Sequence, residues 1–198
     1  MKIVSFSENK NLEKRVAITP EIAKKYSSIG FEVSLPENYA SHLGFTDDDY
    51  KSQGVKIVKD ENELIQNSNL IVQLGLPSDD KLTKFKENQN LIGILNPYTN
   101  KEKLENLSKK KINNFSLELL PRITRAQSMD ILSSQANLAG YKAVIESFSN
   151  FEKAIPMMMT AAGTIPAAKV LIVGAGVAGL QAIATAKRMG AIVFATDV

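Results

Sequence analysis

The amino-acid sequence predicts an α/β fold in which two parallel-sheet domains are joined by a long helix. The first observation is that short apolar runs, rich in β-branched residues, alternate with helical patterns from residue 2 to residue 117. This alternation predicts a parallel sheet with helices on its faces. The second observation is a strand, a glycine-rich turn, a helix and another strand in residues 169–197. A long helical pattern at 128–151 predicts the connection between the two regions.

The first domain is predicted to span residues 1–125 and to begin with a strand at 2–6. Its first helix starts after Thr19, because Thr19 is a suitable N-cap, Pro20 fits the first helical position and Glu21 follows in the first turn. Thr46 and the three aspartates after it predict the start of a second, short helix. Further strands are expected at 31–35, 55–58, 70–74, 91–95 and 112–117, and further helices at 62–66, 78–85 and 101–110.

Residues 126–151 are predicted to be a connecting loop and long helix, and residues 152–198 the start of the second domain. An irregular apolar segment is expected at 156–166, where three consecutive methionines, 157–159, favour core packing over a cofactor contact. The run 170–173 is expected to be a strand buried on both faces. Two strands and one helix bury too little surface to be stable alone, so we expect this chain to be a fragment with an incomplete second domain.

Three glycines, Gly174, Gly176 and Gly179, follow the strand at 170–173 with G-x-G-x-x-G spacing. In such a unit the first glycine makes the turn, the second lets the backbone approach a pyrophosphate, and the third lets helix and strand pack closely. Asp197 ends the next strand about 20 residues further on, where an acid accepts hydrogen bonds from the adenosine ribose and repels a 2′-phosphate. The pattern predicts a Rossmann-like domain that binds NAD(H) rather than NADP(H). The alternative is a βαβ unit whose glycines serve only packing.

The composition limits the other function classes. A net charge of +3, with 23% charged residues, argues against a nucleic-acid partner. The absence of cysteine excludes disulfides and cysteine-ligated metals, and the single histidine, His42, leaves little for a histidine site, so we expect no metal. His42 is expected at the surface, in a polar loop. The N-terminal apolar run is too short for a secretory signal, and glycines interrupt the one stretch, 170–186, that could suggest a membrane span.

A second informative stretch, 120–144, follows a predicted strand and therefore begins where open α/β sheets bind ligands. Two arginines, an amide, an acid and a hydroxyl lie close together there: Arg122, Arg125, Gln127, Asp130 and Ser133. This mixture favours a binding site. The alternative is ordinary helix capping and solvation, since Thr124 and Gln127 have the spacing of a capping box.

These residues carry a resemblance to a known family. The stretch 120–144, together with 14–20, 30–33, 157–164 and the glycine turn, resembles the soluble NAD(H)-binding α subunits of the proton-translocating NAD(P) transhydrogenases, a family that belongs with the alanine dehydrogenases. The resemblance spans nearly the whole chain, more loosely between 35 and 115. It implies hydride transfer from NADH on this subunit to NADP⁺ on another domain, coupled to proton translocation across a membrane, as in Si-specific transhydrogenases.

The resemblance also implies roles for individual residues. The catalytic candidates, which would hold the nicotinamide and its ribose, are Arg122, Gln127, Asp130 and Ser133. The backbone that would line the same end belongs to Arg122, Ile123, Thr124 and Arg125. The pyrophosphate would bind at Gly174, Gly176, Val177, Ala178 and Gly179, and the adenosine ribose at Asp197 and Val198.

The same resemblance implies partners and a location. The expected partners are a membrane-embedded transhydrogenase subunit with its NADP(H)-binding domain, and a second copy of this chain in a homodimer. The protein is expected to be cytoplasmic and peripheral on the inner (plasma) membrane. We expect the fragment alone to be inactive.

Hydride transfer between two nicotinamides needs no general acid or base; it needs two rings close together and little water. A neutral amide such as Gln127 suits that task. One alternative is an alanine dehydrogenase, which needs a proton donor and a cation for the substrate carboxylate; the histidine and lysine of that pattern are not evident at 93–98 and 72–76. Arg15 matches a substrate-binding arginine of those enzymes, although a solvated loop charge explains it equally. The other alternative is a catalytically silent NAD-binding module.

Overall fold

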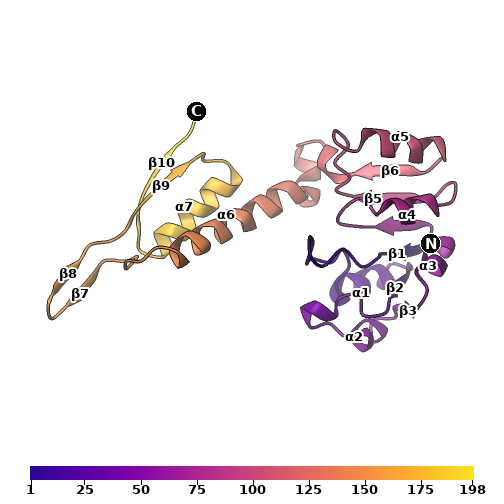
Figure 1. The fold of residues 1–198 in the computed structure, drawn as a ribbon, viewed down its shortest axis with the longest axis horizontal. Coiled ribbons are helices and arrows are strands. Elements are labelled where there is room, and N and C mark those ends of the chain that lie inside the picture. The colour runs from indigo at the N-terminus through magenta and orange to yellow at the C-terminus, as the bar shows by residue number, and fades with distance from the viewer. The chain divides into compact units, whose positions relative to one another are not determined.

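The computed structural model describes residues 1–198, which form two compact units, Met1–Pro121 and Arg122–Val198. We call them the N-terminal unit and the C-terminal unit. Both contain parallel strands connected through helices, so the predicted α/β class is confirmed (Figure 1). None of the helices is both long and apolar enough to cross a membrane.

The N-terminal unit is built on a six-stranded sheet with the order β3-β2-β1-β4-β5-β6, in which every neighbouring pair is parallel. The chain proceeds from β1 to one edge and from β4 to the other, so the topological switch lies between β1 and β4. Ile3 of β1 aligns with Val33 of β2 and Leu70 of β4. The strands are β1 (Lys2–Val4), β2 (Glu32–Pro36), β3 (Lys56–Val58), β4 (Leu70–Val72), β5 (Asn90–Gly93) and β6 (Asn113–Ser116).

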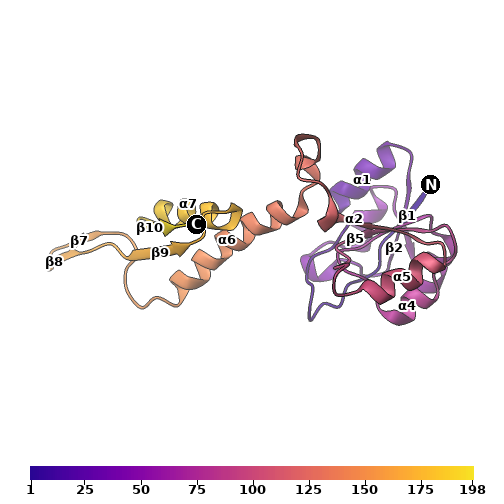
Figure 2. The same cartoon turned by 90° about the horizontal axis from the view of Figure 1, so that it is seen from above.

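Helices cover both faces of this sheet. α1 and α2 contribute to one core and α3, α4 and α5 to the other, and Figure 2 shows α1 and α5 on opposite sides of the strands. The predicted caps are confirmed: Thr19 accepts the Ile22 N–H, and Thr46 forms a capping box with Asp49. The helices are α1 (Pro20–Ser28), α2 (Asp47–Lys51), α3 (Glu61–Asn67), α4 (Asp79–Thr83) and α5 (Lys101–Lys109), with 3-10 turns η1 (Ser41–Leu43) and η2 (Leu117–Leu119).

The alternation of side chains along β1 separates the two cores. Ile3 is buried with Leu35 beneath α1 and α2, and Val4 is buried with Ile71 on the face of α3 to α5. Successive residues of a strand point to opposite faces, so a strand apolar at both positions must be covered twice. The apolar runs of the sequence therefore account for helices on both faces.

The C-terminal unit is a βαβ unit joined to one long helix. Strand β9 (Lys169–Val173) pairs in parallel with β10 (Ile192–Thr196), and α7 (Val177–Arg188) connects them. The long helix α6 (Ile131–Ser149) packs against α7, with Val144 of α6 buried beside Ala182 and Ala186. A 3-10 turn, η3 (Thr124–Met129), precedes α6. Gly190 ends α7 with φ +85°, as the helix-terminating role predicted for it requires.

The start of the long helix differs from the prediction. α6 begins at Ile131 rather than near residue 128, because the carboxylate of Asp130 caps it. Thr124 makes no side-chain cap hydrogen bond, so the capping-box interpretation of Thr124 and Gln127 is wrong.

The segment 156–166 is also ordered differently from the prediction. It forms an antiparallel hairpin of β7 (Met158–Thr160) and β8 (Gly163–Ile165). The expected core packing of its methionines is wrong for this chain, since Met157 and Met159 are 60% and 80% exposed. Both strands of the hairpin pair with each other, and no residue of either is buried.

Strand β9 is buried on one face only, and the expectation of two buried faces is wrong for this chain. Val170 and Ile172 pack against the α6–α7 core, whereas Leu171 and Val173 are 67% and 79% exposed. The reason is that α6 and α7 contribute to the same core, so only one face of the β9–β10 pair is covered.

Candidate functional site

The glycine turn carries the chain from β9 into α7. Gly174 has φ +96°, a conformation that favours glycine, and its N–H donates to the Thr196 carbonyl over 2.8 Å. Gly176 is the N-cap of α7 and has no side chain with which to satisfy the first N–H groups. The first turn of α7 therefore presents donors and the positive end of the helix dipole, an arrangement that binds phosphate groups.

The second and third glycines of the turn have different surroundings. A Cβ on Gly179 would lie 1.8 Å from the Gly174 carbonyl oxygen, so helix and turn meet backbone to backbone. A Cβ on Gly176 would meet nothing within 4 Å. Gly179 is thus required for packing, whereas Gly176 leaves space beside the turn into which a ligand can come close.

An open cleft of about 440 Å³ lies within the C-terminal unit, along the start of α6 and the glycine turn. Arg122 and Ser133 line it from the α6 side, and the turn lines it from the other. The complete lining is Arg122, Leu132, Ser133, Ala136, Val173, Gly174, Gly176, Val177, Ala178 and Gly179. The structure therefore brings together two of the four catalytic candidates and all the predicted residues of the turn.

Asp130 orients Ser133 at the edge of this cleft. Its carboxylate accepts the Ser133 N–H over 2.9 Å and the Ser133 hydroxyl over 2.7 Å. These bonds, together with the nearby Arg122 guanidinium, hold the pKa of Asp130 below its usual range. Asp130 does not line the cleft itself, so its direct contact is with the hydroxyl that does.

We expect this cap to be lost only in strong acid. Because the folded-state pKa of Asp130 is lowered, its stabilising effect is complete above the unfolded-state pKa of about 3.9 and disappears as the pH falls through the lower folded-state value. The Ser133 amide proton, followed by NMR, should shift with a midpoint below about 3.9. Asp130→Asn, which keeps an acceptor, should remove that titration; a Ser133 shift that persists in Asp130→Asn would contradict the assignment.

Asp197 lies against the glycine turn. Its carboxylate accepts hydrogen bonds from the N–H of Ala175 and, over 2.7 Å, from the N–H of Val198. These two bonds, the one from Ala175 first, keep the pKa of Asp197 below its usual range. The carboxylate is thereby held charged beside the turn, with acceptor capacity remaining on both oxygens.

The remaining predicted residues lie outside the cleft lining. Gln127 and its neighbours belong to the exposed 3-10 turn η3, where the Gln127 carbonyl accepts the Asp130 N–H over 3.2 Å. The predicted site residues that do not line the cleft are Ile123, Thr124, Arg125, Gln127, Asp130, Asp197 and Val198.

Sequence reasoning missed three apolar residues of the lining. Leu132 and Ala136 project from the same stretch of α6 as Ser133, and Val173 ends β9. Helical spacing was a usable signal for Ala136, which lies three residues after Ser133 and so shares its face.

The topological switch of the N-terminal unit is filled by the protein's own side chains. Gln73, which is 4% exposed, accepts the Phe6 N–H over 2.6 Å and the Ser5 hydroxyl over 2.8 Å. Its amide nitrogen donates to Glu8 over 3.0 Å, and Glu8 also accepts the Leu74 N–H over 3.0 Å. Burial raises the pKa of Glu8.

Other residues considered at this end of the unit lie at its surface. His42 is exposed and its Nε2 lies 2.7 Å from the Lys14 carbonyl. Arg15 forms an ion pair with Glu13, with 2.6 Å between Nη2 and Oε2.

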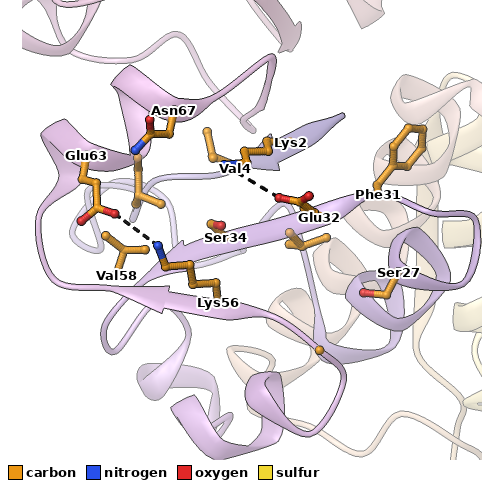
Figure 3. Close-up of a pocket in the computed structure, with 13 residues that line it drawn as sticks. Lys2, Val4, Ser27, Phe31, Glu32, Ser34, Lys56, Val58, Glu63 and Asn67 are labelled. Atoms are coloured by element: carbon orange, nitrogen blue, oxygen red, sulfur yellow. Dashed lines mark hydrogen bonds and ion pairs between the residues drawn. The ribbon is translucent and has the colours of Figure 1, made fainter.

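A smaller cavity of about 240 Å³ lies on one face of β1, β2 and β3 (Figure 3). Its charges are paired with one another: Lys2 with Glu32 at 3.8 Å and Lys56 with Glu63 at 3.2 Å. Lys2, Glu32 and Lys56 begin their strands, whereas open α/β sheets bind ligands beyond the carboxyl ends of strands. We therefore place the candidate site at the cleft of the C-terminal unit.

Comparisons with known proteins cover nearly the whole chain. Residues 5–139 match the model for "Alanine dehydrogenase/PNT, N-terminal domain", and residues 143–198 match that for "Alanine dehydrogenase/PNT, C-terminal domain". The chain is 47% identical over 203 residues to an NAD(P) transhydrogenase subunit alpha of Rhodospirillum rubrum, covering 100% of this chain and 53% of that protein.

A solved transhydrogenase from Sinorhizobium meliloti superposes with a TM-score of 0.91 at 44% identity, covering 98% of this chain and 59% of that one. An alanine dehydrogenase of Methanococcus maripaludis is 28% identical over 194 residues, covering 96% of this chain and 52% of that protein. The chain thus spans about half the length of the curated relatives it matches.

Proposed function

Because the chain belongs to the alanine dehydrogenase/PNT family of oxidoreductases, we propose that it is the NAD(H)-binding part of a proton-translocating NAD(P) transhydrogenase. The observation that carries the proposal is the cleft in which Arg122 and Ser133 face the uncapped glycine turn. The turn fits a pyrophosphate, since its helix N-terminus supplies donors and Gly176 leaves space beside them.

The proposed reaction is direct transfer of a hydride from NADH to NADP⁺ held on a partner domain. NADH, when bound, supplies the hydride at its nicotinamide ring. The glycine turn would fix the pyrophosphate, and Asp197 would accept hydrogen bonds from the adenosine ribose. Arg122 and Ser133 would orient the nicotinamide end, with Asp130 holding the Ser133 hydroxyl in place. None of these groups has to exchange a proton with substrate, which suits a reaction that needs only orientation and little water.

The N-terminal unit supports a transhydrogenase over an amino-acid dehydrogenase. At its topological switch, where such a substrate would be expected, Gln73 is engaged with Ser5, Phe6 and Glu8. Glu8 places a carboxyl group there, and a substrate carboxylate would be repelled by it whenever it is ionised. No histidine or lysine occupies 72–76 or 93–98 to supply a proton or a cation.

We propose the same partners that the family resemblance implies. They are a membrane-embedded subunit, its NADP(H)-binding domain, and a second copy of this chain, with the protein cytoplasmic and peripheral on the membrane. The relative from Rhodospirillum rubrum is named as a subunit. The exposed β7–β8 hairpin supports association, since an isolated two-stranded hairpin is marginally stable in water.

Single-turnover stopped flow on the full-length protein with its partner subunits tests the reaction. Arg122→Ala and Gln127→Asn are expected to slow hydride transfer by about tenfold or more, because a small misplacement of the reacting rings is costly. NADH affinity should change much less. Arg188→Ala, on an exposed residue in the last turn of α7, is the matched control. Full transfer rates in both variants would refute the assignment of this loop.

Two further assays separate the alternatives. Robust alanine-dependent reduction of NAD⁺ by the full-length protein would replace the proposal with an amino-acid dehydrogenase. NADH binding without reduction of an NADP⁺ analogue, in the presence of partner subunits, would indicate a silent NAD-binding module.

Asp197→Ala is expected to lower the preference for NADH over NADPH by about tenfold, since a charge-assisted hydrogen bond to the ribose is lost and the repulsion of a 2′-phosphate disappears. Dissociation constants measured by fluorescence titration with both nucleotides give the ratio. An unchanged ratio would mean that Asp197 does not contact the ribose.

A further inference from the structure

Helices α6 and α7 cross with their backbones in contact at Gly140. Gly140 is buried, and a Cβ added to it would lie 2.0 Å from the Ala178 carbonyl oxygen, 2.8 Å from its carbonyl carbon and 3.0 Å from its Cα. All three atoms belong to the backbone. A side chain at position 140 therefore cannot be accommodated by a change of rotamer and requires the helices to separate.

The contact joins the two walls of the cleft. Ala178 lies in the first turn of α7 and lines the cleft between Gly176 and Gly179. Gly140 lies two turns of α6 after Ser133, on the same face, because residues seven apart in a helix are nearly aligned. Farther along this face Val144 packs against Ala182 and Ala186, so the spacing between the helices is set at Gly140, next to the cleft.

We propose that Gly140 is a positioning residue that sets the distance between the nicotinamide wall of the cleft, carrying Arg122 and Ser133, and the phosphate-binding turn. This inference rests on the proposed function, since it assumes that one NADH molecule contacts both walls. A methyl group at position 140 would force a separation of about 1 Å to reach an ordinary contact distance. A ligand that touches one wall would tolerate that shift, and a ligand that spans both would not.

The test compares two ligands by calorimetric titration of the full-length protein. NADH spans both walls, whereas ADP-ribose lacks the nicotinamide and depends on the turn and Asp197. Gly140→Ala is expected to weaken NADH binding by about tenfold and ADP-ribose binding by less than about threefold, because misplacement of about 1 Å is costly for an oriented group. Asn137→Ala, on an exposed position of the same helix, should leave both affinities unchanged.

The same experiment separates failure of this inference from failure of the proposed function. Wild-type protein that binds neither ligand would refute the proposed function. Wild-type protein that binds both, with an unchanged affinity ratio in Gly140→Ala, would refute the role of Gly140. If Gly140→Ala does not fold by circular dichroism, Ala182→Val enlarges the same helix pair at a side-chain contact farther from the cleft; it should lower the ratio in the same direction, and an unchanged ratio there would refute the inference.

Discussion

The Gly179→Ala variant is expected to bind NADH about 100-fold more weakly than the wild-type protein, a loss of about 2.7 kcal/mol. A Cβ at position 179 would lie 1.8 Å from the Gly174 carbonyl oxygen, and overpacking of this kind costs about 1–3 kcal/mol. Relief of the clash requires α7 to move away from the turn. That movement displaces the N–H groups that would hold the pyrophosphate, so the C-terminal unit should also become less stable.

Gly176→Ala is the matched comparison, because it adds the same methyl group to the same turn. A Cβ there meets no protein atom within 4 Å, and Gly176 does not have a positive φ. The variant should keep wild-type stability in thermal unfolding and still lose affinity for NADH, since the methyl group occupies the space left for phosphate. Equal thermal stability of Gly179→Ala and Gly176→Ala would contradict this division of roles between the two glycines.

The Gln73→Leu variant is expected to lose about 3 kcal/mol of unfolding free energy, the second large effect. Leucine fills a similar volume but leaves the Phe6 N–H, the Ser5 hydroxyl and Glu8 without the partners that Gln73 provides. An unsatisfied buried polar group costs about 1–3 kcal/mol, and more when it is charged. Urea unfolding of the full-length protein, followed by a probe in the N-terminal unit, measures the change.

Gln66→Leu provides the control for this substitution. Gln66 is exposed, and its amide nitrogen makes one long hydrogen bond, 3.4 Å to the Lys84 carbonyl, so its replacement should change stability by less than about 0.5 kcal/mol. The interpretation of Gln73 as the centre of a buried polar network would be wrong if both variants unfolded at the same urea concentration.

The local signals in the sequence predicted the elements of the fold well. Thr19 and Thr46 cap their helices as expected, and the glycines at 174 and 190 have the positive φ that their turns require. These features depend on interactions within a few residues of chain, where side-chain chemistry alone decides. The start of α6 shows how narrow the margin is: Asp130 and Thr124 were both suitable caps, and packing against α7 favoured the helix that begins at Ile131.

By itself, the sequence determined the alternation of strands and helices, the position of the glycine turn and the placement of Asp197 at the end of the following strand. Only the tertiary structure decided which residues meet across space. It placed Gly140 against Ala178, and it engaged Gln73 with Ser5 and Glu8. It also left one face of β9 exposed. The physical reason is that these outcomes depend on the distance between elements far apart in the chain, and packing at fixed density rather than local preference sets that distance.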